Sequence, residues 1–380
     1  MDIAPSRRFD VLLADAGAED LARLERTRHW IMRLANLSAI GPLPAGGAEP
    51  EAAIAHVGAL RVLLAAQEVG LDVGERPVVR RRLQSLPLVV KSLARILRPP
   101  ASQFSRWEEP FVAWAEANGY RFDFAANSDL ESHPADLAAY RLVLSVGHDE
   151  YWSAPMRDHL EGFIAKGGNV AIFSGNTCCW QVRSEDDGSA LTCWKQRFVM
   201  DPVYPTGDHA LLSTLWSHHL VNRPENRLTG AGFLFGGYHR SHGQFMDGSA
   251  AYTVHRPEHW LFTGTNMARG DEFGGKDTIV GYECDGCEFE MRDGLPVPTH
   301  RDGTPEGFTI LASCPAKWHP DDALFYDRFP ADRVGAAVLG TYTRGGTVVT
   351  VGSTDWAHGL RGKDAVVERI TRNILDRLGK

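Results

Sequence analysis

The chain has 380 residues, with 40 Lys or Arg against 48 Asp or Glu, so its formal net charge at pH 7 is −8. Hydrophobic residues make up 43% and charged residues 23%, which is typical of a globular protein and excludes a disordered chain. No apolar run approaches the ~20 residues that cross a bilayer, and the N-terminus lacks the pattern of a signal peptide. We therefore expect a cytoplasmic protein without a membrane partner. The acidic balance also argues against nucleic acid as a partner.

The first hundred residues predict a small α/β appendage, which we assign to residues 1–98. Apolar residues recur at helical spacing over 18–37, and three prolines with three glycines predict a loop over 40–50. A basic, apolar segment at 77–97 predicts an interrupted helix, which two consecutive prolines end.

Residues 101–380 are expected to form one α/β domain. Its predicted helices lie at 111–118, 153–166 and 365–378, and its predicted strands at 120–124, 141–146, 169–175 and 347–353. This alternation predicts a parallel sheet that the C-terminus completes. The glycine-, histidine- and proline-rich stretch 201–332 is expected to be an inserted lobe of β-structure and loops.

Four titratable residues, His148, Asp149, Glu150 and Tyr151, directly follow the predicted strand 141–146. In open α/β sheets the loops at the carboxyl ends of strands converge on ligands. A structural turn would need only Gly, Asn or Ser, so we expect His148 and Glu150 to be catalytic and Trp152 to line the substrate site. The alternative is that Asp149 or Ser153 caps a helix and Trp152 packs beneath it.

The next predicted strand ends in a second polar turn, which contains Asn176 and Thr177. Consecutive parallel strands are often neighbours, so we expect Asn176 as a catalytic residue and Thr177 as a substrate-binding residue facing His148. Gly175 permits close approach of the backbone to a ligand. The alternative, a turn anchored by a tryptophan, has equal weight.

The inserted lobe contains histidines and a pair of cysteines. His239, His242 and His259 are candidate substrate-binding residues, although spacing alone is a weak signal outside a helix. Cys284 and Cys287 form half of a zinc site, but the other cysteines provide no second pair. We favour a tight hairpin turn flanked by two half-buried thiols over a structural metal.

A strand–turn–helix resembles the arrangement by which class I glutamine amidotransferases present a nucleophilic cysteine, but the turn here has neither Cys nor Ser. Another activating device is therefore expected, such as metal-bound water. The phosphate-binding, dinucleotide-binding, zinc-protease and serine-hydrolase motifs do not occur in the sequence.

From about residue 103 to the C-terminus, the motifs GHDEYW, SGNTC, GGYHRSHG, HRPEHW and GYECDGCEFE resemble the C-terminal domain family of the N,N-dimethylformamidase large (beta) subunit. The resemblance implies a flavodoxin-like core of the class I glutamine amidotransferase type. It also implies hydrolysis of a small-molecule amide substrate, and it suggests either a homo-oligomer or a small-subunit partner.

In the amidase itself, the resemblance implies a mononuclear iron held by tyrosine phenolates and a glutamate. Tyr151, in the H-x-E-Y-W match, is the expected phenolate ligand, and Glu283 is the candidate carboxylate ligand. The second tyrosine is expected where this chain has Cys178 and Cys179, so one iron ligand would be missing.

Residues 1–75 show a separate resemblance, to the segment of bacterial valyl-tRNA synthetase between its anticodon-binding domain and its coiled coil. Neither synthetase signature, HIGH or KMSKS, is present. We interpret the segment as an accessory or a fusion remnant.

The leading hypothesis is an amide hydrolase of the dimethylformamidase family that uses metal-activated water, or a diverged relative without that activity. The alternative is a non-catalytic protein that binds a carbohydrate or another small ligand through its tryptophan- and histidine-rich lobe.

Overall fold

The computed structural model describes residues 104–380 except 186–187, 189, 242–243 and 319–332. The chain divides into two compact units, residues 1–103 and 104–380, and only the second is described. The elements expected within residues 1–98 lie outside the described residues.

The core is a seven-stranded mixed sheet in the order β1-β3-β16-β15-β14-β9-β10. In that order the strands are Leu142–His148, Asn169–Gly175, Gly346–Thr350, Val334–Arg344, Thr309–Lys317, Tyr252–Val254 and Glu272–Phe273. Strands β1, β3 and β16 are parallel, and every pairing from β16 to β10 is antiparallel. The α/β class is therefore confirmed, but the parallel sheet that we expected is limited to three strands. A flavodoxin-like fold is not confirmed, because the region expected as a separate lobe contributes β14, β9 and β10 to this sheet.

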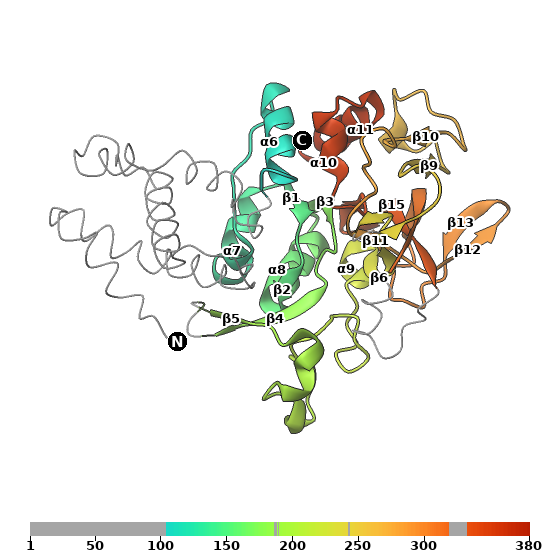
Figure 1. Ribbon diagram of the computed structural model, residues 1–380. Coiled ribbons are helices and arrows are strands. Elements are labelled where there is room, and N and C mark those ends of the chain that lie inside the picture. The colour runs from blue at the N-terminus through green and yellow to red at the C-terminus, as the bar shows by residue number, and fades with distance from the viewer. Residues whose placement is uncertain (1–103, 186–187, 189, 242–243, 319–332) are drawn as a thin grey trace, which may run out of the picture. The chain divides into compact units, whose positions relative to one another are not determined.

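Helices cover both faces of the sheet, as Figure 1 shows. Helices α6 (Glu108–Ala117), α10 (Trp356–Arg361) and α11 (Ala365–Leu378) contribute to one core, and α8 (Ala154–Ala165) contributes to the other. The alternation of side chains along β3 separates the two cores. Ala171 and Phe173 belong to the first, whereas Val170 and Ile172 belong to the second.

The two long helices confirm their predictions, and both have a polar side chain at their N-terminus. Ser153 Oγ accepts the backbone N–H of Met156 at the start of α8. The Asp364 carboxylate accepts hydrogen bonds from the backbone N–H groups of Val366 and Val367 in the first turn of α11. Such caps satisfy donors that have no partner within the helix.

The strand predicted at 120–124 is wrong, because these residues form an irregular segment. Tyr120 stacks against Trp114, and its hydroxyl donates to Asp376 Oδ1 at 3.2 Å. Phe122 packs against Phe111. The aromatic residues that suggested a buried strand are instead anchored to helices α6 and α11.

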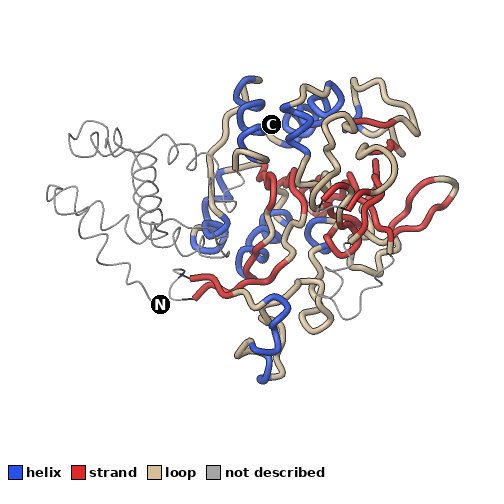
Figure 2. The backbone as a smooth tube through the Cα atoms, viewed as in Figure 1, coloured by secondary structure: helices blue, strands red, loops and turns tan. Residues whose placement is uncertain are grey.

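The remaining elements are short and are joined by loops (Figure 2). The remaining helices are α7 (Asn127–Ser132), η1 (Pro134–Ala139), η3 (Lys195–Met200), η4 (Tyr204–Thr206), α9 (Asn226–Thr229) and η5 (Trp260–Phe262). The remaining strands are β2 (Tyr151–Ser153), β4 (Trp180–Glu185), β5 (Ala190–Thr192), β6 (Gly232–Gly237), β7 (Arg240–Ser241), β8 (Gln244–Phe245), β11 (Cys284–Gly286), β12 (Phe289–Arg292) and β13 (Leu295–Pro298). Across the described ranges, no helix is long and apolar enough to cross a membrane.

Candidate active site

The first part of the site is the end of β1, whose last residue is His148. Gly147 has a φ of +84°, and a Cβ at this position would lie 2.8 Å from Glu108 Oε1 and 2.9 Å from Trp107 Cβ. Glycine therefore lets the end of β1 pass close to the start of α6. The His148 imidazole meets the rings of Trp107 and Tyr282 edge to face, with centroids 5.4 and 5.9 Å away.

The second part is the turn that follows β3 and carries Asn176. A Cβ on Gly175 would lie 2.2 Å from the Glu283 carbonyl oxygen, so the glycine allows β3 to approach Glu283, the residue just before β11. Asn176 adopts a left-handed backbone conformation with φ 52°. The buried carboxyl of Asp285 accepts the backbone N–H groups of Asn176 and Thr177 at 2.9 and 3.1 Å.

These two parts and the residue just before β11 bring three of the sequence-predicted side chains together. His148 Nε2 lies 2.5 Å from Glu283 Oε2. Asn176 Nδ2 donates to the same carboxylate oxygen at 3.2 Å and lies 3.4 Å from His148 Nε2. The hydroxyl of Tyr238 donates to Glu283 Oε1 at 3.3 Å. Glu283 is therefore a carboxylate held on both oxygens, with a histidine directly beside it.

Glu150 joins this group at the same imidazole nitrogen of His148. Its Oε2 atom lies 3.7 Å from His148 Nε2. Its Oε1 atom accepts the indole N–H of Trp180 at 2.6 Å and lies 3.9 Å from Lys195 Nζ. We call His148, Glu150, Asn176 and Glu283 the acid–histidine cluster.

Burial and neighbouring charges act in opposite directions on His148. Burial lowers its pKa, whereas the hydrogen bond and charge of Glu283, with the charges of Glu150 and Asp149, raise it. The carboxylates prevail, so the pKa of His148 lies above its ordinary value. The cluster therefore favours a protonated imidazole between two acidic groups.

One polar atom in the cluster has no partner. Asn176 is only 2% exposed, and its Oδ1 atom is buried without a hydrogen bond among the described residues. A buried carbonyl oxygen normally accepts a hydrogen bond from protein or water. This oxygen is therefore available to accept a hydrogen bond from a water molecule or from a ligand N–H.

Tyr151 does not fit an iron ligand in this arrangement. Its hydroxyl lies 2.5 Å from Lys195 Nζ, and the ammonium also lies 4.7 Å from its ring centroid. A fixed positive charge at this phenol opposes the approach of a metal cation. Burial and Glu150 raise the pKa of Tyr151, which disfavours the phenolate form. Among the residues described, no group of three or more His, Cys, Asp and Glu side chains is placed to hold a metal ion.

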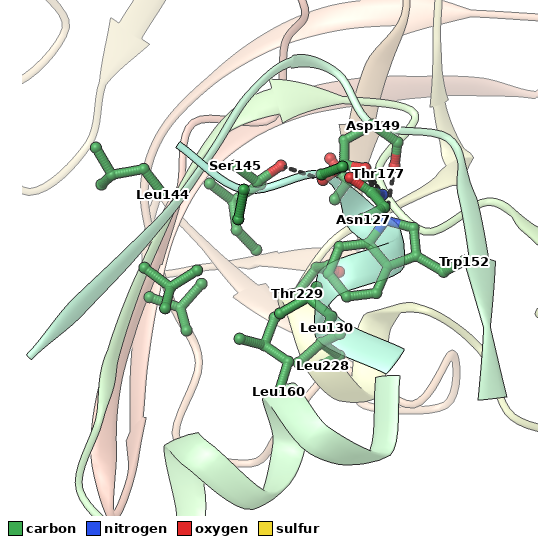
Figure 3. Close-up of a pocket in the computed structure, with 15 residues that line it drawn as sticks. Asn127, Leu130, Leu144, Ser145, Asp149, Trp152, Leu160, Thr177, Leu228 and Thr229 are labelled. Carbon is green, nitrogen blue, oxygen red and sulfur yellow. Dashed lines mark hydrogen bonds between the residues drawn. The ribbon is translucent and has the colours of Figure 1, made fainter. Parts of the chain in front are cut away.

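Thr177 and Trp152 line a cavity of about 80 Å³ beside the cluster. Figure 3 shows Ser145, Asp149 and Asn127 at one end of this cavity and leucines at the other. Asp149 accepts hydrogen bonds from Asn127 Nδ2 at 2.5 Å, Ser145 Oγ at 2.7 Å and Trp152 Nε1 at 2.9 Å. The polar end is thus already paired within the protein. Of the two residues considered as caps of α8, Ser153 is the cap and Asp149 instead accepts a hydrogen bond from Trp152.

Three described histidines of the predicted lobe each have a local hydrogen-bond partner, although the buried Nε2 of His239 has none among the described residues. His239 is 1% exposed and its Nδ1 lies 2.8 Å from the Pro315 carbonyl oxygen. His259 Nδ1 accepts the Leu261 N–H at 3.4 Å, and burial next to Arg377 lowers the pKa of His259 to about 4. His255 Nε2 lies 2.7 Å from Ser313 Oγ. His242 lies outside the described residues.

The hairpin turn predicted between Cys284 and Cys287 is wrong. Residues Cys284–Gly286 form strand β11, which pairs with β6, and both thiols are buried in different cores rather than half-buried. All six cysteines are free. The intervening Asp285, expected in a turn, is the carboxyl that holds Asn176 and Thr177, and burial raises its pKa to about 8.

Sequence reasoning missed four residues that complete the site: Tyr238, Asp285, Trp180 and Lys195. The sequence does show that Trp180 lies five residues after the end of a predicted strand, in the same polar turn as Asn176. In the structure it is the direct partner of Tyr151 in the pairing of β2 with β4. Lys195 lies outside every motif considered, and only the three-dimensional structure brings it to Tyr151.

In comparisons with known proteins, the family model and the two relatives that follow all concern the same enzyme subunit. The family model described as N,N-dimethylformamidase beta subunit-like, C-terminal, matches residues 75–369. The N,N-dimethylformamidase beta subunit of Paracoccus aminophilus is 26% identical over 324 residues, and that of an Alcaligenes species is 25% identical over 324 residues. Each match covers 75% of this chain but only 39% of the relative. The match begins inside the segment that we assigned to the appendage.

Proposed function

The chain belongs to the N,N-dimethylformamidase beta subunit-like, C-terminal family, and we propose that it hydrolyses a small amide at the acid–histidine cluster. The two relatives are named as amidases, and they support this class of reaction. Because the chain spans 39% of their length, the substrate and any partner subunit are part of the proposal.

The contact between His148 and Glu283 carries the proposal. Hydrolysis of an amide needs a base that takes a proton from water, and an imidazole oriented by a carboxylate is well suited to this role. Glu283 Oε2 lies 2.5 Å from His148 Nε2, and Asn176 and Tyr238 hold the carboxylate in place. The carboxylates that raise the pKa of His148 also make it a stronger base. Because its Nε2 faces Glu283, the neutral fraction of His148 would accept the proton at Nδ1 as water attacks the amide carbonyl carbon.

Asn176 and Glu150 have supporting roles in this proposal. The unpaired Oδ1 of Asn176 would accept a hydrogen bond from the attacking water or from an N–H of the amide. Glu150 Oε2, 3.7 Å from His148 Nε2, would stabilise the imidazolium that forms after proton transfer. The imidazolium then returns its proton to the amide nitrogen as the carbon–nitrogen bond breaks, which gives a carboxylic acid and an amine.

If the chain holds the iron ion that the family resemblance implies, Glu283 would be its carboxylate ligand and the ion would polarise the amide carbonyl. The Lys195 ammonium beside Tyr151 opposes a phenolate ligand. Elemental analysis of the protein, purified without added metal, tests this separate proposal. Iron at one equivalent per chain would support it, and a metal-free chain that retains amidase activity would contradict it.

The test of the proposed function is product analysis with formamide, N-methylformamide and N,N-dimethylformamide. Wild-type protein should release formate and the matching amine from at least one of them. His148→Asn should lower kcat by ~10²-fold or more, because it removes the base. His255→Asn is the matched control, because His255 bonds Ser313 rather than a cluster residue. Absence of turnover by the wild type, or equal kcat in both variants, would overturn the proposal.

A further inference from the structure

Beside the acid–histidine cluster, two aromatic rings and a carboxylate enclose the ammonium group of Lys195. Its Nζ atom lies 4.7 Å from the Tyr151 ring centroid and 5.0 Å from the Trp180 ring centroid. The Tyr151 hydroxyl is 2.5 Å away and Glu150 Oε1 is 3.9 Å away. We call Tyr151, Trp180 and Glu150 the ammonium cage.

The fold builds the walls of this cage without help from Lys195. Tyr151 and Trp180 are direct partners in the parallel pairing of β2 with β4. The Trp180 backbone N–H donates to the Glu150 carbonyl at 2.9 Å, and its indole N–H donates to the Glu150 carboxylate at 2.6 Å. Removal of the lysine side chain should therefore leave the two rings and the carboxylate in place.

Lys195 enters the cage from a separate segment, at the start of η3. Its backbone has a φ of 52°, a left-handed conformation that a lysine adopts only at an energetic cost. Its side chain is 34% exposed, so the cage is open to solvent on one side. The contacts of the ammonium with the cage offset the unfavourable backbone conformation.

Aromatic faces combined with a carboxylate are the chemistry that recognises organic ammonium ions. We propose that the ammonium cage is a binding subsite for small alkylammonium ions and that Lys195, itself a primary alkylammonium, fills it when no ligand is bound. Glu150 belongs to both the cage and the acid–histidine cluster, where its other oxygen lies 3.7 Å from His148 Nε2.

The position of the cage suggests what it binds, and this step rests on the proposed function. Hydrolysis of an amide releases an amine, which is protonated at neutral pH when it is an alkylamine. The cage would receive this protonated amine product next to the group that cleaves the bond. Lys195 competes for the same place, so it lowers the apparent affinity by the fraction of time that it occupies the cage.

The experiment measures binding of dimethylammonium chloride to the full chain by titration calorimetry, without turnover. Lys195→Gly empties the cage, and glycine suits the left-handed backbone, so this variant should fold. Lys363→Gly is the matched control, because Lys363 is an exposed lysine with a φ of 58°. Lys195→Asn is a second variant whose side chain also tolerates this conformation. Isopropanol serves as an uncharged probe of similar size.

Lys195→Gly and Lys195→Asn should bind dimethylammonium at least tenfold more tightly than wild type and Lys363→Gly. Trp180→Leu in the Lys195→Gly background should lower the affinity for dimethylammonium at least tenfold. Isopropanol should not bind to any of these proteins. Equal affinity in wild type and Lys195→Gly, or equal binding of the two probes, would overturn the subsite. Because no turnover is measured, the subsite can be confirmed even if no amide is hydrolysed, which would defeat the proposed function alone.

Discussion

The carboxyl of Asp285 holds the backbone of Asn176, whose N–H it accepts at 2.9 Å. Its second oxygen accepts the N–H of Thr177 at 3.1 Å. Because Asp285 and Glu283 lie two residues apart around β11, this contact fixes the turn after β3 relative to the Glu283 side chain. The geometry of the acid–histidine cluster therefore depends on a residue that does not belong to it.

Replacement of Asp285 by Asn should destabilise the protein by about 1–3 kcal/mol, because an amide NH2 would face a backbone N–H that needs an acceptor. Amidase activity should fall with it, since Asn176 would lose its fixed position. Chemical unfolding and kcat measure the two effects. Asp293→Asn, at an exposed turn with a φ of 51°, is the control and should change neither. Wild-type stability in Asp285→Asn would show that the contact does not hold the turn.

Gly175 should tolerate no side chain. An added Cβ would lie 2.2 Å from the Glu283 carbonyl oxygen and 2.6 Å from the Thr354 backbone nitrogen, and neither backbone atom can yield as a side chain can. Gly175→Ala should therefore lower the melting temperature and displace Glu283, with loss of activity.

The matched control is Gly162→Ala within α8, where an added Cβ meets nothing within 4 Å. Alanine favours a helix over glycine by about 0.5–1 kcal/mol, so this variant should be slightly more stable than wild type. The same response to both alanine substitutions would contradict the close approach of β3 to β11.

Glu225 should make stability fall as the pH rises. It is 1% exposed, and burial raises its pKa from 4.5 to about 7. Between these two values the folded protein holds a proton on Glu225 that the unfolded chain has released. The free energy of unfolding therefore decreases from about pH 4.5 to about pH 7, by at most ~1.4 kcal/mol per pH unit from this group.

Glu225→Gln removes this titration, and urea unfolding at several pH values between 4.5 and 8 measures the result. The difference in free energy of unfolding between variant and wild type should grow in favour of the variant up to about pH 7 and then stay constant. A difference that does not change with pH would refute a raised pKa at Glu225.

The elements with strong periodicity could be predicted from the sequence, because each depends on neighbouring residues. Helix α11 has the predicted bounds, and β3 is a continuous apolar strand as expected. The expectation that Asn176 and His148 face each other followed from the pairing of consecutive strands, and β1 and β3 are indeed adjacent. Local sequence patterns and the pairing of consecutive strands therefore predicted three of the four residues of the cluster, His148, Glu150 and Asn176.

The rest of the site depends on contacts distant in sequence. Glu283 and Asp285 reach Asn176 from more than 100 residues away, and no local pattern shows that β11 passes beside β3. Apolar runs do not show strand direction either, so the antiparallel half of the sheet was not expected. Lys195 contacts Tyr151, and its own backbone is in a left-handed conformation that the local sequence does not predict.

The most direct test of the central claim is the kcat of Glu283→Gln for the amide that wild type hydrolyses best. Gln keeps the shape of the side chain but removes the carboxylate charge that orients His148 at 2.5 Å. The account predicts that kcat falls by ~10²-fold or more while the melting temperature stays within a few degrees of wild type. A folded Glu283→Gln protein with wild-type kcat would contradict it.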